Sequence, residues 1–137
     1  MQAVPAGFVP FGLDFGFLRV IGPMYVRMEN GLEVLGLRVE ERHCNSVRIA
    51  HGGLLAAFAD ILVTRSVSVT RDPPAPALTL SLNTDFIGAA PQGCWLEGRA
   101  TVKKATGSIV FATCEVRADE NLVFQASGAM KMLAKRP

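Results

Sequence analysis

The sequence predicts an α+β protein in which one long central helix is wrapped by a curved antiparallel β-sheet. Three observations lead to this prediction. Residues 52–67 form an apolar stretch of helical length with Asp60 as its only acidic residue. An Asn-Gly pair at residues 30–31 separates two strand-like segments, and alternating segments fill most of residues 78–133. A lone helix needs a curved apolar sheet face to cover it, so the two kinds of element predict one fold.

The composition fits a single domain over residues 1–137, with residues 1–14 as an N-terminal arm. Half of the residues are hydrophobic (50%), 19% are charged and the mean hydropathy is +0.30. This is apolar for a small monomer and favours burial of surface against a second copy. A net charge of +2 without a basic run disfavours a nucleic-acid partner.

The sequence also indicates the cellular compartment of the protein. The longest uncharged run, residues 1–13, is too short to span a bilayer and lacks the pattern of a secretory signal. Three cysteines without paired spacing do not predict a disulfide framework. We therefore expect a cytoplasmic protein that does not contact the membrane.

Before the long helix we expect a short helical turn over residues 15–20 and then a hairpin. Its arms, residues 24–29 and 32–40, flank the Asn-Gly turn, and the second arm alternates apolar and polar residues as a half-buried strand does. Residues 41–50 connect this hairpin to the helix.

After the helix, the proline-rich residues 71–76 end it and cannot pair in a ladder. Leu78, Leu80 and Leu82 then alternate with polar residues, which predicts a strand with one apolar face. Three more strands are expected over residues 94–104, 108–118 and 122–133, the first two joined by a turn at residues 105–107. With the strand around Leu80 they would form a four-strand meander.

Asp60 is the residue of the helix that most needs an explanation, because burying a carboxylate is costly unless it is paired or functional. It could cap a loop, pair with Arg65 or act in catalysis. At the helix start, Gly52 and Gly53 carry no side chains that would shield the first-turn amides. Such amides lack intrahelical partners and favour negative charge, so they could form an oxyanion hole. The two glycines could instead permit tight packing or an unusual turn.

The spacing of Gly52 and Asp60 adds a geometric constraint. At about 1.5 Å of rise per residue, they lie roughly 12 Å apart along one helix, too far apart to touch one carbonyl group. Two antiparallel copies of the helix, related by a two-fold axis, could bring Gly52 of one beside Asp60 of the other. If both groups act on one substrate, a homodimer must build the site.

Asn45, His51-Gly52-Gly53 and Asp60, followed by an alternating strand, resemble a pattern of the hotdog-fold acyl-CoA thioesterases. The similarity is greatest to the phenylacetic-acid-degradation type within the 4-hydroxybenzoyl-CoA thioesterase superfamily. That pattern is an Asn, a His-Gly-Gly six residues later and an Asp nine beyond the His. The resemblance covers roughly residues 15–133. It implies the hotdog fold, dimers that often assemble into tetramers, and hydrolysis of an acyl-CoA to a free acid and CoA.

The resemblance also implies roles for individual residues. Asp60 would be the nucleophile or the general base, and the Gly52 N–H would polarise the thioester carbonyl. His51 and Asn45 would orient the reacting groups, and Thr79, four residues before Asn83, would hold a water near Asp60. Coenzyme A is part of the substrate, so neither a separate cofactor nor a metal is expected.

Coenzyme A carries phosphates, so cations are expected near the mouth of the pocket. We predict Lys103, Lys104 and Arg99 for this role, although each of them, taken alone, is better explained as a solvated surface charge. Arg48 stands where the family pattern usually has glycine. Glycine there suggests a positive φ, which costs arginine more, so either the loop is shaped differently or Arg48 adds a cation to the pocket mouth.

Other interpretations stay open beside the hydrolase. Arg48 is compatible with a non-catalytic acyl-CoA-binding hotdog module, and a hotdog enoyl-thioester hydratase or dehydratase would share the fold with a different His-acid pattern. His51 could simply bond its own backbone, and His43 is expected at the surface or in packing. Catalysis by the Cys44 thiolate, with His43 or His51 as its base, is also disfavoured. A thiolate nucleophile needs a nearby base, but adjacent residues on an extended chain, such as His43 and Cys44, point apart. A metal site at His43, Cys44 and His51 would lack a fourth ligand.

Overall fold

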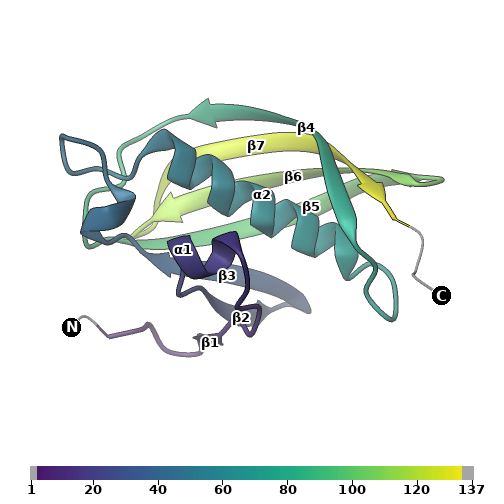
Figure 1. The fold of residues 1–137 in the computed structure, drawn as a ribbon, viewed down its shortest axis with the longest axis horizontal. Coiled ribbons are helices and arrows are strands. Elements are labelled where there is room, and N and C mark those ends of the chain that lie inside the picture. Colours follow the sequence, from purple (N-terminus) through teal and green to yellow (C-terminus); the bar gives the residue numbers. More distant parts are fainter. Residues whose placement is uncertain (1–2, 134–137) are drawn as a thin grey trace.

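A seven-stranded antiparallel sheet curves around one long helix (Figure 1). The structure is a computed structural model and describes residues 3–133. Its elements, in chain order, are β1 Val9–Pro10, α1 Phe17–Ile21, β2 Tyr25–Glu29, β3 Leu32–Arg38, the 3-10 turn η1 Glu41–His43, α2 Gly52–Ser68, β4 Ala77–Phe86, β5 Trp95–Thr106, β6 Ile109–Ala118 and β7 Asn121–Met132. The predicted architecture of one central helix and a curved antiparallel sheet is confirmed.

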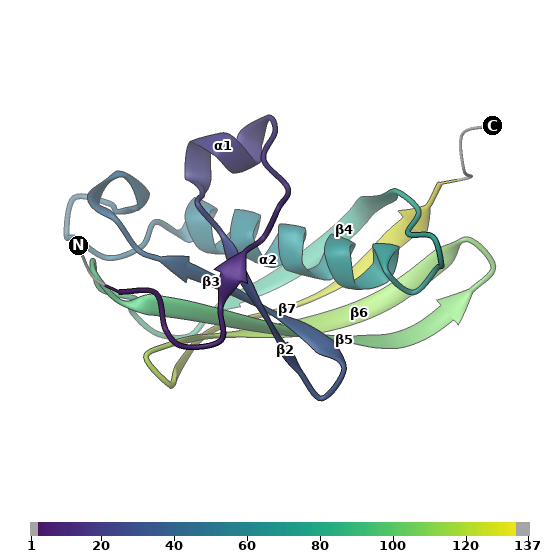
Figure 2. The ribbon, with the colours of Figure 1, turned by 90° about the horizontal axis from the view of Figure 1, so that it is seen from below.

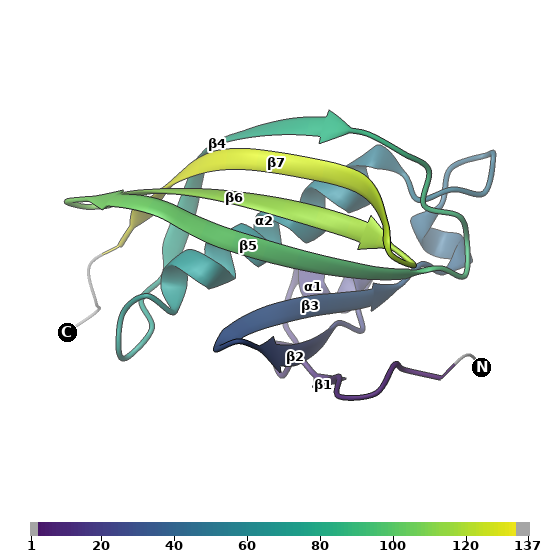
Figure 3. The same cartoon turned by 180° about the vertical axis from the view of Figure 1, so that it is seen from behind.

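Helix α2 lies across the concave face of the sheet, as Figures 2 and 3 show from two sides. It can approach β5 closely because Gly98 has no side chain there. A Cβ at Gly98 would lie 2.7 Å from Leu62 Cδ2 and 2.8 Å from Phe58 Cε1. Phe58 is fully buried and Leu62 nearly so, and burial of apolar side chains of this kind is the main force that holds helix and sheet together.

The hairpin predicted at Asn30-Gly31 is present between β2 and β3. Asn30 and Gly31 have φ values of 51° and 78°, both in the left-handed region that a two-residue hairpin turn of this type requires. The strands pair antiparallel from Glu29–Leu32 to Tyr25–Gly36. The short helical turn predicted near residues 15–20 is also present, as α1.

The predicted four-strand meander is wrong. Strands β5, β6 and β7 form a three-strand meander, whereas β4 pairs with β7 at the far edge of the sheet. The chain leaves β3, crosses the concave face as α2 and enters the sheet at its opposite edge. It then returns to pair β5 with β3. Alternation along the sequence identifies a strand, but it does not identify the neighbour with which that strand pairs.

The single apolar face predicted for Leu78, Leu80 and Leu82 is also not observed. Leu78 and Leu80 are 52% and 56% exposed, whereas Leu82 packs against the core. A register shift between Thr79 and Ser81 interrupts the pairing of β4 with β7, and such a bulge re-aims the side chains around it. Strand β4 therefore presents large apolar side chains at an edge of the sheet.

The apolar composition of helix α2 suggests burial on every side, but the structure shows one side only partly buried. Leu55, Phe58 and Val63 face the core, whereas Ala56, Ala57 and Asp60 are only partly buried. The partly exposed side carries small side chains around the carboxylate. Among the residues that the structure describes, no helix combines the length and the apolar character needed to cross a bilayer.

The N-terminal arm packs beside this framework. Strand β1 pairs with β2, and the Phe8 ring meets the Trp95 ring edge-on at 5.1 Å between centroids. The chain then rises to the side of the sheet that holds α2, where α1 lies beside the first half of that helix (Figure 2).

Candidate active site

The first two amides of α2, those of Gly52 and Gly53, differ in their hydrogen bonding. His51 is the N-cap, and its Nδ1 accepts a hydrogen bond of 2.8 Å from the Gly53 N–H. The predicted alternative, in which His51 bonds its own backbone, is therefore observed. Because Nδ1 accepts this bond, a neutral ring carries its proton on Nε2, which can donate to a substrate. Within residues 3–133, the Gly52 N–H has no hydrogen-bond acceptor, so this amide can donate to a substrate oxygen.

Asn45 shapes the loop that leads into the helix. Its Oδ1 accepts hydrogen bonds from the Val47 N–H at 3.1 Å and the Ile49 N–H at 3.3 Å. Its backbone N–H also donates to the Ile49 carbonyl at 2.9 Å. The side-chain oxygen is thus engaged in the loop, and the Nδ2 group is the part of Asn45 that could donate to a ligand.

Arg48 occupies the backbone conformation that glycine would adopt at this position. Its φ is 62°, which lies in the left-handed region, and its N–H donates to the Asn45 carbonyl at 3.1 Å. Arg48 thus keeps the positive φ that glycine would adopt, and its side chain is exposed. Its role as a cation at the mouth of the pocket stays a prediction.

Asp60 lies on the partly exposed side of α2 and faces β4. The Thr79 hydroxyl donates a hydrogen bond to Asp60 Oδ1. Thr79 therefore points toward the helix, and its alternation with Leu78 and Leu80 does not place it on the outer face of the sheet. The contact fixes one carboxylate oxygen and leaves Oδ2 available for a water or a substrate carbonyl.

Asp60 does not pair with Arg65, as one interpretation of the sequence suggested. Arg65 instead makes a bidentate ion pair with Glu33, with Nε–Oε2 and Nη2–Oε1 distances of 3.0 and 3.1 Å. Within the described part of the chain no ion pair includes Asp60. One chain also does not bring Gly52 and Asp60 together, because Asp60 follows Gly52 by eight residues of the helix, a rise of about 12 Å.

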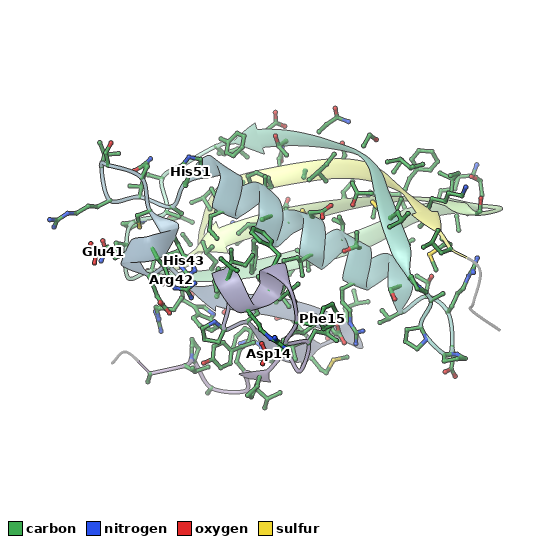
Figure 4. The ribbon with its side chains drawn as sticks, in the orientation of Figure 1. Asp14, Phe15, Glu41, Arg42, His43 and His51 are labelled. Atoms are coloured by element: carbon green, nitrogen blue, oxygen red, sulfur yellow. The ribbon has the colours of Figure 1, made fainter. Side chains whose placement is uncertain are left out.

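His43 connects the elements around the helix start, a role that the sequence alone did not indicate. It is 4% exposed, and its Nδ1 accepts from the Glu40 N–H at 2.9 Å while Nε2 donates to the Ile21 carbonyl at 2.7 Å. Its backbone carbonyl accepts from the His51 N–H at 2.9 Å. Burial lowers the pKa of His43, which keeps the ring neutral so that it can accept and donate at once. Figure 4 shows His43 between α1 and the start of α2, with Arg42 next to it.

The cysteines are poorly suited to nucleophilic catalysis. Burial raises the pKa of the Cys44 thiol, and it raises the pKa of Cys94 to about 12 and of Cys114 to about 11. A thiol must ionise to become a strong nucleophile, so these shifts disfavour all three. Across residues 3–133 no three His, Cys, Asp or Glu side chains gather in the way a metal ion would need.

The cations predicted to bind phosphate lie in two different environments. Lys103 and Lys104 are exposed beside a bulge in β5, near the β5–β6 turn. Arg99 forms ion pairs with Glu29 at 2.7 Å and with Glu97 at 3.1 Å. These bonds lower the pKa of Glu29 and raise that of Arg99. The role of the three cations stays a prediction.

Comparisons with known proteins identify the family to which this fold belongs. The model of the thioesterase superfamily matches residues 48–124, which include the loop at Arg48, all of α2 and Asp60. This chain belongs to the thioesterase superfamily. It is 37% identical over 133 residues to a Pseudomonas aeruginosa protein named as a candidate esterase, covering 96% of this chain and 99% of that protein. Thioester hydrolysis is thus the general chemistry of this chain.

Two further relatives place it within the superfamily. Human acyl-coenzyme A thioesterase 13 is 28% identical over 101 residues, with 73% of this chain and 71% of that protein covered. A variant of the phenylacetic acid degradation protein of Thermus thermophilus superposes with a TM-score of 0.74 at 25% identity, over 85% of this chain and 98% of that one. The fold of this superfamily member is the hotdog fold, as the resemblance of its sequence implied.

Replacing Arg48 by glycine should stabilise this thioesterase. A non-glycine residue in the left-handed region costs about 1 kcal/mol or more, which glycine avoids, so Arg48→Gly should increase the free energy of unfolding by up to about 1 kcal/mol. Chemical denaturation would measure it. Arg71→Gly, an exposed arginine without a positive φ, is the matched control and should be neutral or destabilising. Equal losses in the two variants would contradict the interpretation.

Proposed function

We propose that this protein hydrolyses an acyl-CoA thioester to a free carboxylic acid and CoA, at a site shared by two copies of the chain. The observation that supports it best is the position of Asp60 in a thioesterase-superfamily chain. Its carboxylate lies on the partly exposed side of α2 and is held by the Thr79 hydroxyl rather than by a cation. A carboxylate in that state is ready to accept a proton or to attack a carbonyl carbon.

The exposed edge of β4 supports the shared site. Strand β4 pairs with β7 on one side only, and such an edge offers its unpaired amides and carbonyls to another strand. Leu78, Leu80 and Phe86 are each more than half exposed along it. If two copies pair β4 with β4 about a two-fold axis perpendicular to the sheet, both α2 helices lie on the same face and run antiparallel. This arrangement would bring the start of one α2 toward Asp60 on the other.

In the proposed reaction, the thioester carbonyl oxygen accepts a hydrogen bond from the Gly52 N–H of one protomer. This amide, at the positive end of α2, stabilises the negative charge that develops on that oxygen. Asp60 of the other protomer removes a proton from the attacking water, or attacks the carbonyl carbon itself. In either route the C–S bond then breaks, and CoA leaves as a thiolate that takes up a proton. In the second route the acyl group is left as a mixed anhydride with Asp60, and a water hydrolyses this anhydride to release the acid and restore the carboxylate.

The remaining residues would position these groups. Thr79 donates to Asp60 Oδ1 and so orients Oδ2 toward the carbonyl carbon. The Nε2–H of His51 and the Nδ2 group of Asn45 are donors at the entrance of the same helix start. A tetramer of the two-fold pairs is compatible with this scheme but is not required for it.

Lys103 and Lys104 are the preferred candidates for the CoA phosphates. The β5–β6 turn reaches toward the end of the molecule where α2 finishes (Figure 1), and an antiparallel partner would place its own helix start toward that end. Arg99 is less suited, because Glu29 and Glu97 already neutralise its charge.

Replacing Asp60 by asparagine should abolish hydrolysis while the fold and the assembly persist. Asparagine is similar in size to aspartate but can neither attack the carbonyl nor act as a base at neutral pH, so we expect kcat to fall by about a hundredfold or more. The measurement is CoA release over a panel of acyl-CoA thioesters, with Tm and oligomeric state recorded in parallel. Asp85→Asn, which changes an exposed carboxylate on β4 that accepts from Gln125, is the control. Wild-type turnover by the Asp60 variant would end the proposal.

Replacing Gly52 by proline tests the amide alone. Proline has no N–H but is well tolerated at the first helical position, and the extended backbone of His51, with φ −60° and ψ 139°, suits a residue that precedes proline. We expect the loss of one oxyanion donor to reduce kcat by about a hundredfold or more. Gly52→Ala keeps the N–H and controls for the added Cβ, which would lie 3.0 Å from the exposed Phe86 ring. Equal turnover by the two variants would show that this amide is not the donor.

A further inference from the structure

A cavity of about 380 Å³ opens beside the first turn of α2. Phe17 and Val20 of α1 form one wall, Leu54 forms part of the inner surface, and His51 and Gly53 lie at the end where the proposed reaction takes place. The cavity therefore adjoins the helix start at which the proposed reaction takes place, and Phe86, which lies against Gly52, is not part of its lining.

The wall formed by α1 is held in place by hydrogen bonds to the carbonyl groups at its C-terminal end. The Arg42 guanidinium donates to the carbonyls of Val20 and Gly22, and His43 Nε2 donates to the Ile21 carbonyl at 2.7 Å. These are the carbonyls that the end of a helix leaves without intrahelical partners. The same His43 accepts from the His51 N–H. One short turn, η1, thus sets the distance between α1 and the start of α2.

Two side chains on α1 are exposed in a way that packing does not explain. Phe17 is 58% exposed and Val20 is 62% exposed, although both border the cavity. Apolar side chains at the rim of a cavity gain when an apolar ligand covers them. The charged group of the lining, Arg42, is already bonded to backbone carbonyls, so the cavity offers an anion no uncommitted cation.

From this arrangement we infer that the cavity holds the acyl group of the substrate, and that Phe17 and Val20 determine which acyl groups bind. The inference rests on the proposed site at Gly52. The apolar lining suits a hydrocarbon or aromatic acyl group, whereas the phosphate-bearing CoA arm must leave on another side. The cavity size suits a medium-length chain or a single ring.

Binding of non-hydrolysable S-alkyl-CoA thioethers tests this inference without any turnover. Calorimetry would give Kd for CoA and for its butyl, hexyl and octyl thioethers. In the wild type, each added methylene that is buried should tighten binding by about fourfold. Val20→Phe should fill the cavity, so that octyl-CoA binds at least tenfold more weakly while CoA itself binds as before. Phe17→Ala should also weaken octyl-CoA binding selectively.

Phe15→Ala is the matched control. Phe15 is 60% exposed, two residues before Phe17, and is not part of the cavity lining. Figure 4 shows it at the end of α1 opposite Arg42 and His43. This variant should retain the wild-type dependence on chain length. The inference is overturned if wild-type affinity does not rise with chain length, if Val20→Phe keeps the wild-type dependence, or if CoA binding falls as much as octyl-CoA binding. Absence of hydrolysis with intact chain-length dependence would instead count against the proposed function alone.

Discussion

The rigid spacing within α2 is the constraint on which the site depends. A helix holds its first amide and a carboxylate eight residues later at about 12 Å from each other, and no movement of side chains removes that separation. Gly52 and Asp60 are both accessible on α2, yet a single chain cannot apply them to one carbonyl. The exposed β4 edge, with Leu78 and Leu80 turned outward, supports pairing of two copies as the way in which this separation is overcome.

A second constraint is the stability of the helix start itself. The loop at residues 45–49 is closed by Asn45, and His51 caps the helix through its own ring. His43 then joins this region to α1 and to Glu40, which follows β3. A neutral His43 is required for these bonds, because protonation of Nδ1 would remove the acceptor of the Glu40 N–H. The proposed oxyanion donor, the Gly52 N–H, therefore lies in a segment held by several hydrogen bonds, as precise placement of a catalytic group would require.

Local chemistry allowed much of the fold to be predicted from the sequence. Asn30-Gly31 specifies a turn with two positive φ values, and residues 52–67 predict a single helix because apolar residues occupy every side of it. Asp60 and Gly52 could be chosen because a carboxylate and two glycines are unusual in such a helix. Thr79 was found through the family pattern and not through alternation. Simple alternation would place Leu78 and Leu82 on the inner face and Thr79 on the outer face. The bulge at Leu80 instead puts Leu78 and Leu82 on opposite faces, so that Thr79 shares the inner face with Leu82.

The sequence could not show which residues far apart in the chain contact one another. The position of β4 at the far edge, the pairing of Arg65 with Glu33 and the contact of Arg42 with α1 each join residues far apart in the chain. No local propensity specifies such contacts. The cavity beside His51 belongs to the same class, since its walls come from three separate segments.

Mixing two inactive chains tests the shared site most directly. Under the proposal, homodimers of Asp60→Asn and of Gly52→Pro each lack one of the two groups in both sites, whereas a hybrid of the two has one site with both groups intact. If subunits assemble at random from equal amounts, half of the dimers are hybrids, so CoA release should recover to about a quarter of the wild-type rate. A mixture that exchanges subunits yet stays as inactive as its parents would contradict the account, because a site contained within one chain cannot be restored in this way.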